Sequence, residues 1–128
     1  MSDDPLFEHQ RSYTRAHIHA TLGGSVQSYL PEVAGKIVAI CLKPDMNPGV
    51  PETVLIGKGE KIESGAARLV EQAAGLPTFI KRENNQWRFV GYYRATGITR
   101  EGADFSRRAL RARRTDVVAM LTLEAVVG

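Results

Sequence analysis

Two short apolar segments flank a proline-rich segment, and this arrangement most constrains the fold. Residues 44–51 read Pro-Asp-Met-Asn-Pro-Gly-Val-Pro. Because proline fixes its own φ and lacks a backbone donor, these residues predict a rigid loop. The flanking segments, 36–43 and 53–57, are short, rich in β-branched residues and bounded by glycine or proline. They predict two buried strands joined by a stiff connection.

Helical periodicity is found in other parts of the chain. Residues 61–74 place apolar side chains at offsets 0, 4, 7, 8 and 11, and Gly75 and Pro77 follow them. An amphipathic helix packed on a sheet is therefore expected. A shorter helix is predicted from a cap at Thr14 to a stop at Gly23. Residues 103–114 are rich in Ala, Leu and Arg, and they indicate either a helix or an irregular insertion.

The second half of the chain favours consecutive strands. Residues 78–81, 87–96 and 116–127 alternate or cluster apolar side chains, and residues 82–86 have the composition of a hairpin turn. On the long middle strand, Trp87, Phe89 and Tyr93 are expected to share one face. The order of elements predicts an α+β domain, a curved and partly closed β-barrel with one main packed helix and a short N-terminal helix.

Length and composition are those of one globular domain with one core. The chain has 128 residues, of which 43% are hydrophobic and 24% charged. We expect a frayed segment over 1–12 and a single domain over 13–128. The only cysteine is Cys41, in an apolar segment, so no internal disulfide is possible and a buried, inert thiol is expected. Neither a signal peptide nor an apolar membrane span is evident, which favours a cytoplasmic protein.

Positive charge is concentrated near the C-terminal strand. Residues 98–116 hold six arginines against three carboxylates, so this segment carries an excess equal to the +3 of the whole chain. The arginines are Arg100, Arg107, Arg108, Arg111, Arg113 and Arg114. Such a cluster is either a surface that neutralises phosphates or an ordinary solvated face.

Motifs of catalysis are missing from the sequence. It contains no Gly-x-Ser-x-Gly and no phosphate-binding Gly-x-x-x-x-Gly-Lys. His17 and His19 are two residues apart, so on a helix their rings would diverge by about 200° and would not share a metal. We therefore expect no metal, no cofactor and no enzymatic activity.

Aromatic residues lie among arginines and amides. Tyr13, Tyr29, Trp87, Tyr92 and Tyr93 are near Arg11, Arg15, Arg88, Arg94, Gln27 and Asn47 in the sequence. Stacking combined with amide hydrogen bonds is how proteins hold unpaired bases. The alternative is that the aromatic side chains only fill the core.

Several short motifs together resemble a known family. They are Tyr13-Thr-Arg15, Ile18-His19, Gly23-Gly24, Gln27-Ser28, Leu30-Pro31, Asn47-Pro48, Pro51, Phe79-Ile-Lys-Arg82 and Trp87-Arg-Phe-Val-Gly91. With these motifs, residues 13–95 resemble the SRA-like domain of McrA-type HNH restriction endonucleases. The resemblance implies a PUA-like barrel that reads a modified cytosine, such as 5-methylcytosine, in double-stranded DNA by base flipping. No HNH signature is present, so any role in restriction or phage defence would require a separate nuclease.

The resemblance and the charge pattern together give a set of candidate residues. The base-pocket candidates are Tyr13, Gln27, Ser28, Tyr29, Asn47 and Trp87. The phosphate-binding candidates are Arg15, Arg88, Arg107, Arg108, Arg111 and Arg114. We expect the Gln27–Tyr29 loop, Asn47 and Trp87 to converge on one pocket of nucleobase size. The alternative functions are a PUA-like protein that binds RNA or a nucleotide ligand, and an unrecognised enzyme or interaction subunit.

Overall fold

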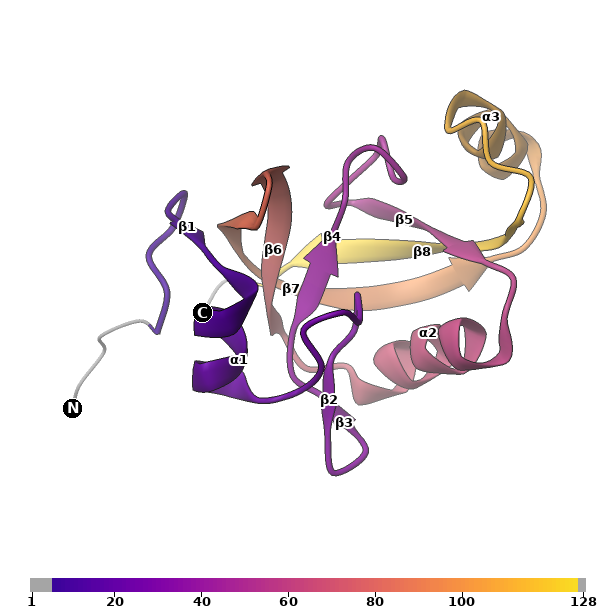
Figure 1. Cartoon of the computed structure of the whole chain (residues 1–128). Helices are drawn as coiled ribbons and strands as arrows, with labels where there is room; N and C mark the ends of the chain where they lie inside the picture. Colours follow the sequence, from indigo (N-terminus) through magenta and orange to yellow (C-terminus); the bar gives the residue numbers. More distant parts are fainter. Residues whose placement is uncertain (1–5, 127–128) are drawn as a thin grey trace.

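The computed structural model describes residues 6–126, which form a strongly curved six-stranded sheet, a separate two-stranded sheet and three helices (Figure 1). The strands are β1 (Ser12–Tyr13), β2 (Glu32–Val33), β3 (Lys36–Ile37), β4 (Ile40–Leu42), β5 (Thr53–Gly57), β6 (Leu76–Glu83), β7 (Gln86–Thr99) and β8 (Val117–Ala125). The helices are α1 (Arg15–Leu22), α2 (Glu60–Gln72) and α3 (Ala103–Arg111). The predicted α+β class is confirmed.

The main sheet is open between two edge strands. Its order is β4-β6-β7-β8-β5, with β1 added beside β7, and β2 and β3 form a separate hairpin. β4 and β6 are parallel, whereas the other pairs are antiparallel. Because β4 and β5 lie at opposite ends of this order, the curved sheet forms the partly closed barrel that the sequence predicted.

The helices begin and end where local signals place them. The Thr14 hydroxyl accepts a hydrogen bond from the His17 backbone N–H at 3.1 Å, and Gly23 ends α1 at φ +86°. α2 lies within two residues of its predicted limits. α3 is a regular helix, which decides between the two alternatives for this segment. Every helix of residues 6–126 is too short or too polar to cross a bilayer.

The predicted strand over 36–43 is divided into β3 and β4. Between them the chain turns toward the segment that follows α1. The Val38 N–H donates to the Pro31 carbonyl at 2.8 Å, and the Cys41 N–H donates to the Tyr29 carbonyl at 2.8 Å. Both bonds connect this part of the chain to an irregular segment, and the Cys41 bond uses one hydrogen-bonding group on the otherwise unpaired edge of β4.

Two apolar clusters cover the two faces of the sheet, where the sequence predicted one core. Along β4, Ile40 and Leu42 belong to the cluster that packs against α2, and Cys41 belongs to the cluster beneath α1. The α2 cluster includes Leu69 from the helix, and the α1 cluster includes Ile18. Side-chain alternation along the strands thus separates the two clusters.

The N-terminal segment is more ordered than its composition predicted. Residues 1–5 lie outside the described residues, but Phe7 is only 1% exposed. Its ring packs edge-on against Tyr13 and Phe79, with centroids 5.0 and 4.9 Å away. The prediction of a frayed segment is therefore wrong for residues 6–12, because one aromatic side chain holds this segment to the α1 cluster.

Because of a bulge in β7, its aromatic side chains do not all lie on one face of the sheet, which corrects the prediction from the sequence. The pairing with β6 shifts register between Thr78 and Phe79, and Gly91 has φ +119°. Trp87 and Phe89 belong to the α1 cluster, whereas Tyr93 packs against the α2 cluster. The extra residue at the bulge interrupts the two-residue alternation, so the three side chains do not share one face.

Candidate functional site

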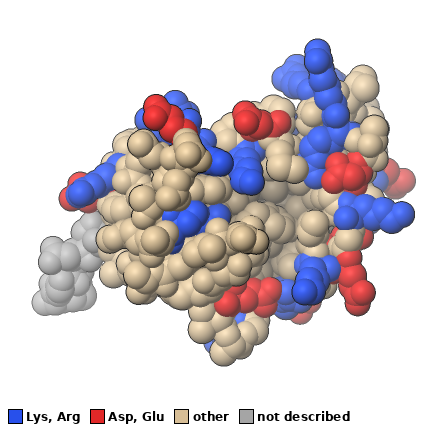
Figure 2. Space-filling view, viewed as in Figure 1, with Lys and Arg blue, Asp and Glu red and all other residues tan. Residues whose placement is uncertain are grey.

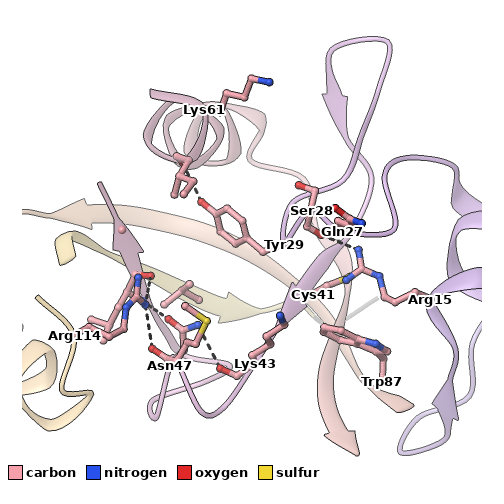
Figure 3. Close-up of a pocket in the computed structure, with 15 residues that line it drawn as sticks. Arg15, Gln27, Ser28, Tyr29, Cys41, Lys43, Asn47, Lys61, Trp87 and Arg114 are labelled. Atoms are coloured by element: carbon pink, nitrogen blue, oxygen red, sulfur yellow. Dashed lines mark hydrogen bonds between the residues drawn. The ribbon is translucent and has the colours of Figure 1, made fainter. Parts of the chain in front are cut away.

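A cavity of about 330 Å³ lies where the barrel is open. Its lining comes from both edge strands, β4 and β5, from the loops 25–29 and 43–47, from the first turn of α2, and from Trp87 and Arg114. Figure 2 shows the face that is hollowed near its centre, with Lys and Arg side chains beside the hollow. Figure 3 shows the lining side chains. Of the base-pocket candidates, the structure brings five together here and leaves Tyr13 out.

The loop after α1 supplies Gln27, Ser28 and Tyr29. It is held closely at its base, since Gly24 has φ +83° and a Cβ there would lie 2.6 Å from the Pro31 Cβ. The Tyr29 hydroxyl donates to the Ile62 carbonyl at 3.1 Å, and burial raises the pKa of Tyr29 to about 12. The Tyr29 ring is thus a fixed, uncharged wall of the cavity, tied to α2. Gln27 is exposed, and its side-chain amide has no hydrogen bond to a described residue, whereas its backbone N–H donates to the Ser25 hydroxyl.

Asn47 stiffens the proline-rich loop from within. Its side chain is 9% exposed, its Oδ1 accepts from the Leu55 N–H at 2.8 Å, and its Nδ2 donates to the Lys43 carbonyl at 3.4 Å. The carbonyl oxygen and one amide hydrogen are therefore engaged with the backbone. This corrects the prediction that Asn47 offers a full set of donors and acceptors to a base, because one N–H remains.

Arg114 forms a clamp that ties Asp116 to the backbone of the proline-rich loop and of β5. Its Nε and Nη2 donate to the two Asp116 oxygens at 3.1 and 3.0 Å, and its Nη1 donates to the Met46 and Leu55 carbonyls at 3.1 and 3.4 Å. These hydrogen bonds also lower the pKa of Asp116. Gly57 leaves room for the clamp, because a Cβ there would lie 2.9 Å from Arg114 Nη2 and would displace it. Arg114 was predicted to contact phosphate, but its guanidinium is used within the protein.

Arg15 and Trp87 form the other end of the cavity. Trp87 is 4% exposed, and the Arg15 Cζ lies 4.7 Å from the centroid of its ring. Arg15 is itself 8% exposed, with Nε donating to His19 Nε2 at 2.8 Å and Nη2 donating to the Ser25 and Ser28 carbonyls at 3.1 and 2.8 Å. One face of Trp87 is thus covered by Arg15. Trp87 thus lines the cavity, as predicted for a base-pocket candidate, and it also backs the wall that holds the Gln27 loop.

Two predicted site residues lie elsewhere. Tyr13 packs in the α1 cluster, stacked on His17 with centroids 5.1 Å apart, and its hydroxyl accepts from the Glu8 N–H at 2.7 Å. Arg88 is adjacent to Trp87 in β7 and therefore points to the other face of the sheet, away from the cavity. Its Nε is buried without a hydrogen-bond partner among the described residues. The position of Arg88 follows from the strand alternation at Trp87, whereas Tyr13 is held in the α1 cluster by its contacts with Phe7 and His17.

α3 projects from the barrel and buries none of its residues (Figure 1). Arg107 and Arg108 both donate to Asp104, at 3.1 and 3.0 Å, and Arg108 also donates to the Thr53 hydroxyl at 3.2 Å. The Arg108 hydrogen bond is the main reason that the pKa of Asp104 is lowered. Arg111 is exposed and has no ion-pair partner within residues 6–126. Three of the phosphate-binding candidates thus lie on α3, and two of them, Arg107 and Arg108, bond to the same carboxylate.

The sequence analysis missed the two lysines of the cavity. Four of the fifteen lining residues are basic and none is acidic. Two of these four are Lys43, directly after β4, and Lys61, in the first turn of α2; both are exposed. The position of Lys43 between a predicted strand and the rigid loop was the available signal.

The sequence matches one protein family over most of its length. Residues 12–117 match the family described as Domain of unknown function (DUF6697). The chain belongs to this family. No protein with curated annotation matches the sequence of this DUF6697 chain.

The fold of the DUF6697 chain is similar to that of a solved SRA domain. The structure is described as a crystal structure of the SUVH5 SRA domain in complex with hemimethylated CG DNA. The TM-score is 0.61 at 14% sequence identity, and the match covers 97% of this chain and 91% of the other. The SRA-like fold that the sequence resemblance implied is thereby confirmed.

His19 of the DUF6697 chain is hydrogen-bonded through both ring nitrogens. His19 Nδ1 lies 2.7 Å from the Gly23 carbonyl, so its proton is assigned to Nδ1 and Nε2 accepts from Arg15. Residues 6–126 hold no group of three or more His, Cys, Asp or Glu side chains arranged to bind a metal ion.

Cys41 lines the cavity of the DUF6697 chain, yet we expect it to be unreactive. It is 1% exposed, and burial raises the pKa of its thiol to about 11. Because the thiolate is the nucleophile, alkylation of folded protein by iodoacetamide at about pH 8 should be at least roughly a hundredfold slower than alkylation in denaturant. Mass spectrometry of timed samples measures both rates. Equal rates would contradict the burial of this thiol.

Proposed function

We propose that the chain is a non-catalytic DNA-binding module that reads a modified cytosine by holding the extruded base in the cavity between β4 and β5. The observation that carries this proposal is the composition of the cavity. Its lining has no acidic residue, one fixed aromatic wall and three basic residues that form no ion pair with a described residue, namely Arg15, Lys43 and Lys61. A nucleotide combines a negative charge with a planar ring, so it matches both features. The similarity of fold to an SRA domain supports the same function.

The walls suggest how a base would be held. Tyr29 offers a ring for stacking, worth about 1 to 3 kcal/mol per base, and the apolar side chains of Val54 and Leu55 also line the cavity. Gln27 is the candidate for reading the base edge, because its amide can both donate and accept. Unstacking the base costs a few kcal/mol, and contacts in the cavity would offset this cost.

α3 is the candidate for contact with the DNA backbone outside the cavity. Arg111 is the clearest position, because its charge has no carboxylate partner within residues 6–126. We expect Arg111→Gln to weaken binding to every duplex alike and to reduce the slope of log Kd against log salt by about 0.9, the value for one lost phosphate contact.

Lys36→Gln is the matched control for this slope. It also removes one charge, but Lys36 lies on the β2–β3 hairpin, away from α3 and the cavity. Titrations at several salt concentrations measure the slope for both variants. Equal changes in the two would argue against a specific role for α3.

Within this proposal the chain supplies recognition, and a separate nuclease would supply cleavage in restriction or phage defence. The walls of the cavity contain neither a carboxylate nor a histidine among the described residues, and Cys41 is buried. We therefore propose no hydrolytic chemistry for this site.

Extrusion of the base can be tested directly with a fluorescent analogue. 2-Aminopurine placed next to the modified cytosine should brighten several-fold on binding, because unstacking of its neighbour relieves quenching. A duplex with plain cytosine is the control. Binding with unchanged fluorescence in both duplexes would mean that DNA is bound without base flipping.

A further inference from the structure

Arg15 is a buried cation without a carboxylate partner. It is 8% exposed and forms no ion pair with a described residue. His19 accepts a hydrogen bond from Arg15 and so supplies no negative charge, and Cys41 nearby is a neutral thiol at physiological pH because burial raises the pKa of that thiol to about 11. A buried guanidinium usually has an anionic partner, because desolvation of a lone charge is costly. The charge of Arg15 is therefore open to compensation by a ligand.

One nitrogen of this guanidinium remains available. Nε and Nη2 donate to His19, Ser25 and Ser28, whereas Nη1 has no hydrogen bond to a described residue. Nη1 is not one of the buried polar atoms without a partner, so it keeps some accessible surface, and Arg15 lines the cavity. Figure 3 shows the guanidinium at the cavity wall, with the Lys43 amine directed to the same space.

A second hollow continues from this end of the cavity. It has a volume of about 480 Å³ and shares Arg15, Gln27, Lys43 and Trp87 with the cavity. From there it extends to Lys81 and to the Asn84–Asn85 turn between β6 and β7. Its lining also contains no acidic residue. Arg15 and Lys43 thus stand at the junction of two connected, positively charged hollows.

We propose that this junction binds the phosphate of the nucleotide whose base occupies the cavity, and that the strand leaves along the hollow toward Lys81. This inference rests on the proposed function and adds the path of the strand. A phosphate accepts several hydrogen bonds at once, which suits Arg15 Nη1 together with the Lys43 amine. The base then lies against Tyr29, on the far side of Lys43 from the second hollow.

The inference can be tested with DNA in which one phosphate is replaced by an uncharged linkage. A methylphosphonate placed on either side of the modified cytosine removes the charge of one phosphate. We expect one of the two positions to weaken binding of the unaltered protein by about tenfold, as for a charge-assisted contact. In Lys43→Gln, the same linkage should weaken binding by less than about threefold, because the partner is already lost.

Lys61→Gln is the matched control. Lys61 lines the cavity, but its amine points away from the junction in Figure 3, so this variant should remain fully sensitive to the neutral linkage. Unchanged affinity with both neutral linkages, or equal sensitivity in Lys43→Gln and the unaltered protein, would overturn the inference. Tighter binding of a free deoxynucleoside monophosphate than of the duplex would assign the phosphate to a free nucleotide and would overturn the strand path.

The same titrations separate this inference from the proposed function. If modified and plain duplexes bind alike, the proposed function fails and the strand path fails with it. If the modified duplex binds more tightly while neither linkage matters, only the strand path is wrong.

Discussion

Trp87→Ala should lower the free energy of unfolding by about 3 to 5 kcal/mol, the range for removing a large buried aromatic side chain. Trp87 is 4% exposed and belongs to the α1 cluster. Its loss also removes the ring on which Arg15 rests at 4.7 Å, so the loop that Arg15 holds should loosen as well. Chemical denaturation followed by circular dichroism measures the change.

Trp87→Phe is the control for the size of the cavity left behind. It keeps a ring beneath Arg15, so its cost should be clearly smaller than that of Trp87→Ala. A cost below about 1 kcal/mol for Trp87→Ala would contradict the buried, wall-forming role of Trp87.

Tyr29→Ala should reduce the preference for modified over plain duplex by roughly tenfold to a hundredfold, equivalent to the loss of one stacked base. The Tyr29 ring lines the cavity and is fixed at its far end by the Ile62 carbonyl. Salt-dependent binding to plain DNA should change little, because Tyr29 carries no charge. The measurement is the ratio of dissociation constants for the two duplexes at one salt concentration.

Tyr29→Phe is the matched control for this effect. It keeps the ring and removes only the hydroxyl that donates to Ile62, so most of the preference should remain. A thermal melt of both variants checks that they are folded. A preference that survives Tyr29→Ala would show that this ring does not read the base.

Local signals predicted the elements of this fold because local interactions form them. The Thr14 cap, the stop at Gly23 and the apolar stripe of α2 each depend on residues within a few positions of one another. The open barrel also followed from the order of the elements. The bulge in β7 could not be predicted, since it depends on pairing with β6.

The sequence predicted that five of the candidate side chains lie around one cavity, but it did not predict which of their polar atoms are already bonded within the protein. The sequence gives the number of donors and acceptors, whereas the tertiary structure decides which of them are already used. The side-chain oxygen of Asn47 accepts a hydrogen bond from the Leu55 N–H. The Arg114 guanidinium donates to the carbonyl of Met46, 68 residues away in the chain. Such distant partners cannot be read from composition or spacing. The sequence placed Lys43 beside the rigid loop, but only the fold shows that it lies between the two hollows.

A binding panel of the purified protein tests the central claim most directly. The panel contains duplexes that differ only in plain, methylated or hydroxymethylated cytosine, together with RNA of matched sequence. We predict that one modified duplex binds at least about tenfold more tightly than the plain duplex and the RNA, a difference of about 1.4 kcal/mol or more. Equal affinity for all duplexes, or tighter binding of the RNA, would contradict the account.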